Sequence, residues 1–120
     1  MKPIVVILCG GRGTRLQEQS QAVPKPLVEV GGRPIVWHVI EMYLAHGFHR
    51  FLLLTGYLAE QVEAFVAASS WPGEAQIACL DTGAETATGE RLRRAASALE
   101  EERFCLAYAD GVADIDLARL

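Results

Sequence analysis

The chain has 120 residues, of which 51% are hydrophobic and 22% charged, and its formal net charge is −4. This composition excludes an intrinsically disordered chain, and the acidic balance argues against a general nucleic-acid-binding protein. No apolar run reaches the roughly 20 residues of a membrane-spanning helix, and Met1-Lys2 leads into the first predicted strand without a signal peptide. We therefore expect one cytoplasmic domain over residues 1–120 that binds neither membrane nor nucleic acid.

The first predicted element is a short, continuously apolar run from Pro3 to Cys9, which is typical of a fully buried β-strand. A loop containing Gly10, Gly11 and Gly13 follows directly. Glycine has no Cβ, so the backbone N–H groups of such a loop can converge closely on an anion. A glycine loop at the end of a strand predicts a phosphate-binding site, with a plain tight turn as the alternative.

Basic side chains are concentrated in and just after this loop. Between residues 10 and 33, four basic residues stand against two acidic ones, although the whole chain is acidic. Lys25 is the only lysine after Lys2 and lies between two prolines, which fix the backbone on either side and make it a preset point charge. Such a segment attracts an anionic ligand. The segment is not a Walker loop, because no Gly-Lys-Ser/Thr follows the glycines. It is not a dinucleotide-binding pattern either, because the third glycine of Gly-x-Gly-x-x-Gly is missing.

After this segment, apolar residues alternate between helical spacing and short strand-like runs. The predicted elements are, in chain order, a helix between Pro34 and Gly47, a strand over 51–55, a helix with Leu58, Val62, Phe65 and Val66 on its apolar face, a strand over 76–80, a helix with Thr88 as its N-cap, and a strand over 104–108. A last helix is expected to start at Leu117. Strands that alternate with helices imply right-handed crossovers, so we expect an α/β fold with a doubly wound, mainly parallel sheet in three layers.

Such a sheet binds ligands beyond the carboxyl ends of its strands, and three stretches of the sequence fall there. The glycine loop follows the first strand, residues 81–91 follow the third, and Asp110 follows the fourth. Arg91 lies in the first turn of its helix, where a positive charge opposes the helix dipole unless an anion is bound. This position favours a phosphate-binding role, and the alternative is a solvated arginine beside Arg93 and Arg94.

Asp110 is the candidate metal ligand. A carboxylate at a strand end, followed here by Gly111, can bind a Mg²⁺ ion whose remaining ligands are water and phosphate oxygens. The alternative is an aspartate that only forms a turn. Asp114 and Asp116 do not have the spacing of an EF-hand loop, so no chemistry is assigned to them.

The cysteines and histidines are interpreted as structural. Cys9, Cys79 and Cys105 are odd in number, widely spaced and set in apolar, strand-like contexts. This pattern favours reduced core cysteines over disulfides, metal ligands or a nucleophile. The histidines are scattered on or after the first predicted helix, so a catalytic histidine is not expected.

The glycine loop and the segments after it resemble one known family. Gly10 to Leu16 reads Gly-Gly-x-Gly-Thr-Arg-Leu and is followed by Pro24-Lys25-Pro26, which is the N-terminal signature of the sugar-1-phosphate nucleotidyltransferases. Segments that resemble its glucose-1-phosphate cytidylyltransferase branch are residues 28–35, Trp37-His38, Gly56-Tyr57, Asp81-Thr82-Gly83, Thr88 to Leu92 and Tyr108 to Asp114. The resemblance extends over essentially the whole chain, but over only about the first half of a complete family member.

The resemblance implies the Rossmann-like nucleotide-diphospho-sugar transferase fold and a defined reaction. A cytidylyl group passes from CTP to a sugar 1-phosphate, glucose 1-phosphate in this branch, and pyrophosphate leaves. Mg²⁺ is the implied cofactor with Asp110 as its ligand, and Arg15 and Lys25 are the implied catalytic residues. The implied nucleotide-binding residues are Leu8, Cys9, Gly10, Gly11, Arg12, Gly13, Thr14, Thr86, Arg91 and Ala109. Ala109 stands where the family usually has glycine.

The rest of the family's catalytic machinery lies beyond the stretch that this chain resembles. It includes a second metal-binding aspartate, most of the sugar pocket and much of the oligomer contact. We therefore expect residues 1–120 to form one nucleotide-binding domain that is incomplete at its C-terminus, and a homo-oligomer is left open. Two other classes of function remain as alternatives: a non-catalytic module that binds a nucleoside triphosphate, and a regulatory or interaction domain of the α/β class.

Overall fold

Four parallel strands run through the centre of the molecule. The computed structural model describes residues 2–10, 14–15, 22–83, 86–99 and 103–108. Its main sheet has the order β7-β6-β1-β8, and every pair of neighbours is parallel. The strands are β1 (Ile4–Cys9), β6 (Arg50–Thr55), β7 (Gln76–Asp81) and β8 (Phe104–Tyr108). Their positions confirm the four strands predicted from short apolar runs.

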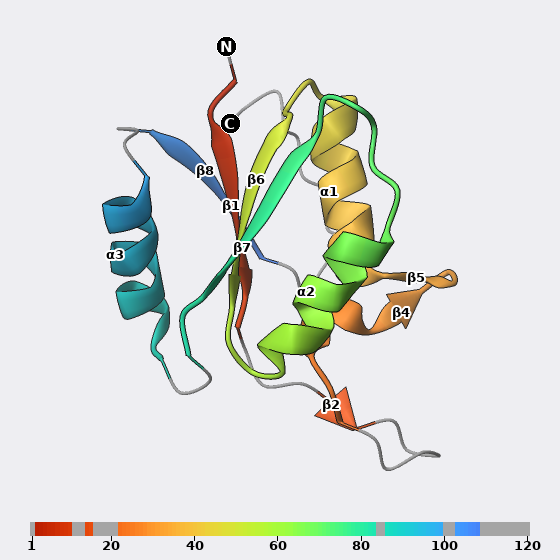
Figure 1. Ribbon diagram of the computed structural model, residues 1–120, viewed down its shortest axis with the longest axis horizontal. Coiled ribbons are helices and arrows are strands. Elements are labelled where there is room, and N and C mark those ends of the chain that lie inside the picture. Colours follow the sequence, from red (N-terminus) through yellow and green to blue (C-terminus); the bar gives the residue numbers. More distant parts are fainter. Residues whose placement is uncertain (1, 11–13, 16–21, 84–85, 100–102, 109–120) are drawn as a thin grey trace.

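Helices cover both faces of this sheet (Figure 1), which confirms the predicted three-layer α/β fold. α1 (Ile35–Ala45) and α2 (Ala59–Ala68) lie on one face, and α3 (Thr88–Ala98) lies on the other. From β1 the chain adds β6 and β7 on one side and then places β8 on the opposite side of β1. Ligands of doubly wound sheets bind at such a switch point, at the carboxyl ends of the strands. The favoured place is therefore the edge between β1 and β8.

The central strand β1 is buried on both faces. Alternate side chains of a strand point to opposite sides of its sheet. Val5 and Ile7 pack in the hydrophobic cluster that includes α1 and α2, whereas Ile4 and Val6 pack in the cluster that includes Ala95 of α3. Burial of each such side chain contributes about 1.5–3 kcal/mol. The glycine loop therefore starts from one of the most rigidly packed parts of the molecule.

Several short elements between β1 and α1 were not predicted. The antiparallel pairs are β2 (Thr14–Arg15) with β3 (Ala22–Val23) and β4 (Glu29–Val30) with β5 (Arg33–Pro34), and η1 (Lys25–Leu27) is a 3₁₀ helix between them. In the β4–β5 turn, φ is 63° at Gly31 and 82° at Gly32, as a two-residue type I′ hairpin requires. Strands of two residues are too short for their hydrophobic pattern to be recognised in the sequence.

Two helices start one residue away from their predicted starts. The prediction that Thr88 caps the third helix was wrong: Ala87 is the N-cap of α3, because its carbonyl already accepts the N–H of Arg91 at 3.0 Å. Leu58 was assigned to the apolar face of the second helix, but it precedes α2 with φ 52°, which is uncommon for leucine. The turn at Gly56, whose carbonyl accepts the N–H of Ala59 at 3.1 Å, brings the chain into α2 through that conformation.

The three cysteines are free, as predicted. Cys9 is buried, and Cys79 and Cys105 are half-buried. Burial raises the pKa of all three thiols, and it raises that of Cys79 to about 11 with a smaller contribution from Glu63. At neutral pH they are therefore thiols rather than nucleophilic thiolates.

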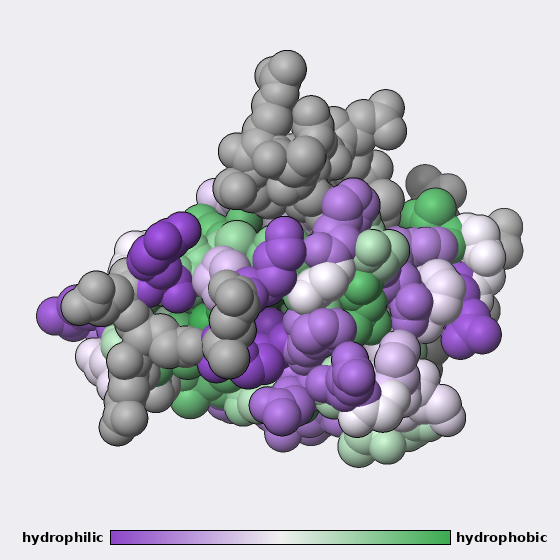
Figure 2. Space-filling model, turned by 90° about the horizontal axis from the view of Figure 1, so that it is seen from above, coloured by the Kyte–Doolittle hydropathy of each residue, from purple (hydrophilic) through white to green (hydrophobic). Residues whose placement is uncertain are grey.

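Hydrophilic side chains are spread over the amino edge of the sheet, which Figure 2 views from above. A shallow hollow of about 280 Å³ at this edge is lined by Lys2, His49, Arg50, Glu74 and Gln76. None of the helices in the described residues combines the length and the apolar character that crossing a bilayer requires. The amino edge lies opposite the edge at which the glycine loop begins.

Candidate functional site

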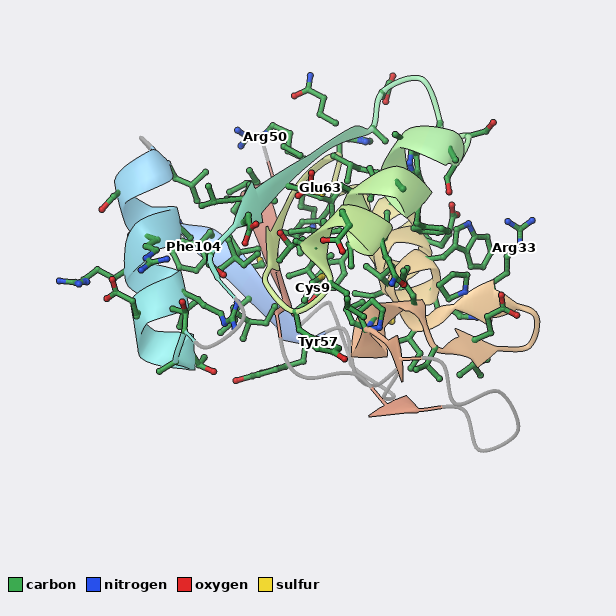
Figure 3. All side chains as sticks on the ribbon, turned by 60° about the horizontal axis from the view of Figure 1, so that its bottom comes forward. Cys9, Arg33, Arg50, Tyr57, Glu63 and Phe104 are labelled. Carbon is green, nitrogen blue, oxygen red and sulfur yellow. The ribbon has the colours of Figure 1, made fainter. Side chains whose placement is uncertain are left out.

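The carboxyl ends of β1, β6 and β7 lie level with one another because the three strands pair in register. Cys9 pairs with Thr55, and Thr55 pairs with Asp81. The next residue of β1, Gly10, accepts the N–H of Tyr57 at its carbonyl oxygen, at 3.4 Å. Figure 3 brings this edge forward and shows Cys9 and Tyr57 near its centre. Residues from three separate parts of the sequence therefore meet where the glycine loop starts.

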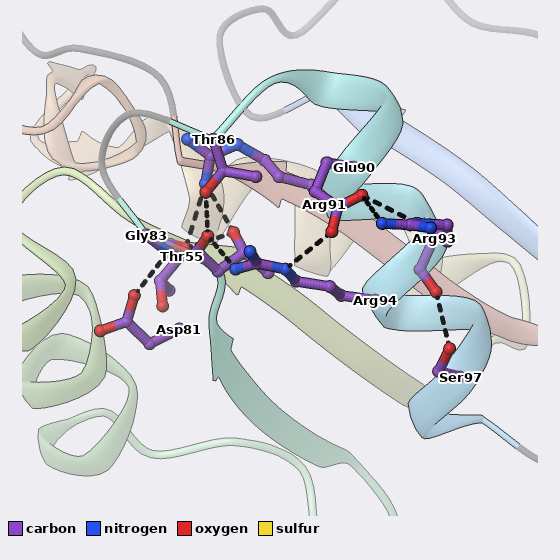
Figure 4. Close-up of polar contacts among 10 residues, drawn as sticks. Thr55, Asp81, Gly83, Thr86, Glu90, Arg91, Arg93, Arg94 and Ser97 are labelled. Carbon is purple, nitrogen blue, oxygen red and sulfur yellow. Dashed lines mark hydrogen bonds and ion pairs between the residues drawn. The ribbon is translucent and has the colours of Figure 1, made fainter.

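Arg91 lies inside this edge and joins the three strand ends. It comes from the first turn of α3 and is only 5% exposed. Its Nη1 donates to Thr82 Oγ1 at 2.6 Å and to the Thr55 carbonyl at 3.2 Å (Figure 4). Its Nη2 donates to the Gly10 carbonyl at 3.0 Å. One guanidinium group thus connects β1, β6 and the segment that follows β7.

At two of these strand ends the guanidinium group occupies the space that the Cβ of another residue would need. A Cβ at Gly10 would overlap Nη1 of Arg91. A Cβ at Gly56 would lie 2.5 Å from the same Nη1 and 2.6 Å from the Gly83 carbonyl oxygen. Neither Gly10 nor Gly56 has the positive φ that would by itself call for glycine. A side chain of the protein itself thus approaches Gly10 closely, and the predicted binding of an anion by the backbone N–H groups of the glycine loop stays a prediction.

The charge of Arg91 strengthens these contacts. Burial lowers the pKa of Arg91, the nearby Arg94 lowers it further, and Asp81 acts in the opposite direction. An arginine keeps its proton in a protein even so, because its ordinary pKa is above 12. A hydrogen bond to a charged partner contributes about 1.5–3 kcal/mol. The strand ends are therefore joined by a permanent cation.

The loop after β7 is ordered by its own side chains. Asp81 Oδ1 accepts the N–H of Gly83 at 2.9 Å, and the Thr86 hydroxyl donates to the Thr82 carbonyl. Thr82 is buried and donates its hydroxyl to the Thr55 carbonyl at 2.7 Å. Gly83 has φ 91°, a conformation that favours glycine. The described residues Thr82, Gly83 and Thr86 are thus held by hydrogen bonds within the protein.

The outer face of α3 carries a separate charged cluster. Glu90 accepts hydrogen bonds from Arg93 Nε at 2.8 Å and Arg94 Nε at 3.3 Å, and these arginines hold the pKa of Glu90 below its ordinary value. Arg94 Nη1 also donates to the Thr82 carbonyl at 2.7 Å. The alternative that Arg91 is a solvated arginine beside Arg93 and Arg94 was wrong. These two exposed arginines line a surface hollow of about 530 Å³ with Leu80, Asp81, Glu90 and Ser97.

Replacing Thr82 with valine is expected to lower the free energy of unfolding by about 1–3 kcal/mol, because the buried Thr55 carbonyl loses a donor and Arg91 loses an acceptor. Urea unfolding followed by circular dichroism measures the effect. The matched control is Thr88→Val, an exposed position at the start of α3, where the change should stay within about 0.5 kcal/mol. Equal stabilities of the two variants would show that the Thr82 hydroxyl has no such role.

The structure brings together two of the three predicted stretches. Leu8 and Cys9 form the carboxyl end of β1, and Gly10 follows directly. Arg91 reaches Gly10 from α3. Thr86 is half-buried beside Thr82. What these residues do toward a nucleotide stays a prediction.

The predicted catalytic residues lie on short elements after the glycine loop. Thr14 and Arg15 form β2, and Lys25 begins η1. The flanking Pro24 and Pro26 are buried, and the N–H of Leu27 donates to the Pro24 carbonyl at 2.9 Å, so the backbone at Lys25 is fixed. The catalytic roles of Arg15 and Lys25 stay predictions.

Several predicted residues lie outside the described part of the chain. They are Gly11, Arg12, Gly13, Ala109, Asp110, Asp114, Asp116 and Leu117. Within the described part, no group of three His, Cys, Asp or Glu residues is placed to hold a metal ion. The proposed metal ligand Asp110 is therefore not tested by the geometry.

Sequence reasoning assigned no site role to three residues of this edge, although Gly56 and Thr82 lie in segments that carry the family resemblance and Thr82 lies in the predicted stretch 81–91. Thr55, Gly56 and Thr82 were treated as a strand end, a turn and a loop, but all three contact Arg91 or make room for it. The available signal was the ending of the β6 strand: a polar residue closes an otherwise apolar run and glycine follows at once. The same combination of strand end and glycine occurs after β1.

The doubly wound parallel sheet places the chain in the class of α/β proteins that bind their ligands at the carboxyl edge of the sheet. Within this class, the chain belongs to the family of MobA-like NTP transferase domains, which matches residues 5–118. The predicted membership among nucleotidyltransferases is thus confirmed.

Two curated relatives are similar to almost the whole chain. A protein of Bacillus subtilis (strain 168), named "Probable glucose-1-phosphate cytidylyltransferase", is 37% identical over 96% of this chain and 53% of its own length. The "Glucose-1-phosphate cytidylyltransferase" of Salmonella typhimurium is 35% identical over 93% of this chain and 52% of its own length. The chain spans about half the length of these relatives.

A solved structure supports the same relationship. HddC from Yersinia pseudotuberculosis, crystallised in complex with GMP-PN, superimposes with a TM-score of 0.81 at 27% identity. The match covers 98% of this chain and 52% of HddC. The predicted Rossmann-like fold of nucleotide-diphospho-sugar transferases is confirmed.

Proposed function

We propose that this chain carries the nucleotide-binding part of a sugar-1-phosphate nucleotidyltransferase that transfers a cytidylyl group from CTP to glucose 1-phosphate. The observation that carries the proposal is the place of the glycine loop. It begins at Gly10, directly after the central strand and beside the switch point between β1 and β8. The identities of 37% and 35% to proteins named glucose-1-phosphate cytidylyltransferases support the choice of substrates.

In the proposed reaction, an oxygen of the sugar phosphate attacks the α-phosphorus of CTP. The bond from that phosphorus to the bridging oxygen breaks, and pyrophosphate leaves with the bonding electrons. No covalent enzyme intermediate is needed, so the protein acts by positioning and by neutralising charge. Backbone N–H groups of the glycine loop would bind phosphate oxygens, Arg15 would neutralise the leaving pyrophosphate, and Lys25 would contact oxygens at the reacting centre.

Asp110 would hold Mg²⁺ at the same edge. It lies two residues after the end of β8, and β8 pairs with β1 up to the contact of Tyr108 with Leu8. The chain therefore leaves β8 beside the end of β1. Carboxylate oxygens are the ligands that Mg²⁺ takes together with substrate phosphates. When bound, the ion would supply positive charge against the triphosphate.

The test of this function is the release of pyrophosphate by a protein that contains this chain, in the presence of Mg²⁺, CTP and glucose 1-phosphate. We expect release that requires all three components and is about tenfold or more slower with UTP or GTP. Binding of CTP with Mg²⁺ but without release would identify a non-catalytic nucleotide-binding module instead. A thermal unfolding midpoint that no nucleoside triphosphate shifts would overturn both and favour a regulatory α/β domain.

A further inference from the structure

The contacts of Arg91 lead from the interior of the fold to the start of the glycine loop. Among the described residues, the guanidinium group donates to Gly10 directly after β1, to Thr55 of β6 and to Thr82 after β7, and the residue is 5% exposed. We infer that Arg91 is a positioning residue of the nucleotide site: it fixes the backbone at Gly10, the described residue at which the glycine loop begins. This inference rests on the proposed function only for the identity of the nucleotide.

The carbonyl of Gly10 is the group through which Arg91 fixes the backbone after β1. It accepts Nη2 of Arg91 at 3.0 Å and the N–H of Tyr57 at 3.4 Å. Two donors from different elements thus fix the last peptide group before the glycines at 11 and 13. A strand end that is fixed before a ligand arrives loses less conformational entropy when the ligand binds beside it. Removing one of these donors should therefore weaken nucleotide binding without removing a ligand contact.

The space around the guanidinium group indicates that Arg91 and Gly10 fit each other. The three atoms that a Cβ at Gly10 would meet first all belong to the Arg91 side chain. Gly10 has no positive φ, so its backbone conformation does not by itself exclude alanine. The residue type at position 10 is thus determined by a side chain of α3 as well as by any ligand.

A direct contact between Arg91 and a phosphate would make different predictions. Such a contact is electrostatic, so its loss reduces the salt dependence of binding. It leaves the order of the unliganded loop unchanged. A positioning role instead disorders the strand ends before any ligand is added, and it leaves the salt dependence as it was.

The experiment compares Arg91→Met and Arg91→Lys with the control Arg93→Met. Arg93 lies on the same helix but is exposed and pairs with Glu90. Isothermal titration measures the dissociation constant of Mg·CTP at low and high salt. Hydrogen exchange measures the opening of the Tyr57 and Thr82 amides in the unliganded protein, and urea unfolding gives the global stability for comparison.

We expect Arg91→Met to raise the dissociation constant about tenfold or more with an unchanged salt dependence, and to speed exchange at Tyr57 and Thr82 more than global stability accounts for. Arg91→Lys keeps the charge but not the fork of donors, so it should restore the affinity only in part. Arg93→Met should match the wild type. Weaker binding with unchanged exchange would instead indicate a direct phosphate contact, and lower stability with unchanged affinity would indicate a purely structural role; either overturns the inference.

A double substitution tests the fit between Arg91 and Gly10 independently of any nucleotide. Gly10→Ala alone should lower the thermal unfolding midpoint, whereas adding it to Arg91→Ala should cause little further loss, because the clashing atoms are gone. If the losses of the two single variants add up in the double variant, Arg91 does not restrict the residue at position 10. If Arg91→Ala does not fold, the exchange rates of Arg91→Lys decide the question. A wild-type chain that binds no nucleotide would overturn the proposed function, while the exchange rates still report whether Arg91 orders Gly10.

Discussion

Replacing Lys25 with alanine is expected to lower the rate of pyrophosphate release by about 10²–10³-fold, the cost of removing one preorganised charge from a reacting phosphate. The backbone at Lys25 is held in η1 between two buried prolines. The fold should be unaffected. The measurement is the steady-state rate at saturating CTP and glucose 1-phosphate, together with the urea midpoint of the variant.

The chain offers a matched control, because its only other lysine lies at the opposite edge of the sheet. Lys2 is exposed, and its Nζ lies 4.9 Å from the centroid of the Phe48 ring. Lys2→Ala removes the same charge from the chain and should leave the rate unchanged. Equal rates for the two variants would remove Lys25 from the reacting centre. If the chain binds CTP without turnover, the dissociation constant of Mg·CTP replaces the rate as the readout.

The main sheet was predictable because its strands are buried. β1 and β6 are almost continuous apolar runs, and both pack against side chains from helices on either face. In a chain of this length, the centre of the sheet is the place that buries such a run on both faces. The β2–β3 and β4–β5 pairs contain two residues per strand, so their sequence carries no comparable pattern. Their pairing depends on turn geometry and on contacts with the rest of the fold.

The sequence predicted where the candidate site lies, but it did not predict which way the Arg91 side chain points. Helical spacing set Arg91 in the first turn of α3, and the sheet topology set that turn at the carboxyl edge. A long side chain at such a position can turn outward to solvent or inward to the strand ends. The choice depends on the room left by Gly10 and Gly56, which are distant in sequence. A single sequence does not reveal that coincidence.

Gly56→Ala is the second substitution for which a large effect is expected. The added Cβ would lie 2.5 Å from Nη1 of Arg91 and 2.6 Å from the Gly83 carbonyl oxygen. A side chain can move away, but Gly83 belongs to the backbone of a loop held by Asp81. Overpacking of this kind costs about 1–3 kcal/mol. We expect a loss of that size in the free energy of unfolding and weaker binding of Mg·CTP, since the loop after β7 is displaced.

The matched control is Gly73→Ala, because a Cβ at Gly73 would meet no atom within 4 Å and that glycine has no positive φ. Its stability should equal that of the wild type or exceed it by up to about 1 kcal/mol, because alanine restricts the unfolded chain. Combining Gly56→Ala with Arg91→Ala should leave a loss, in contrast to the pair at Gly10, since shortening the arginine removes only one of the two clashes. A full recovery would mean that the Gly83 carbonyl moves freely and that Arg91 alone determines which residues fit at this edge.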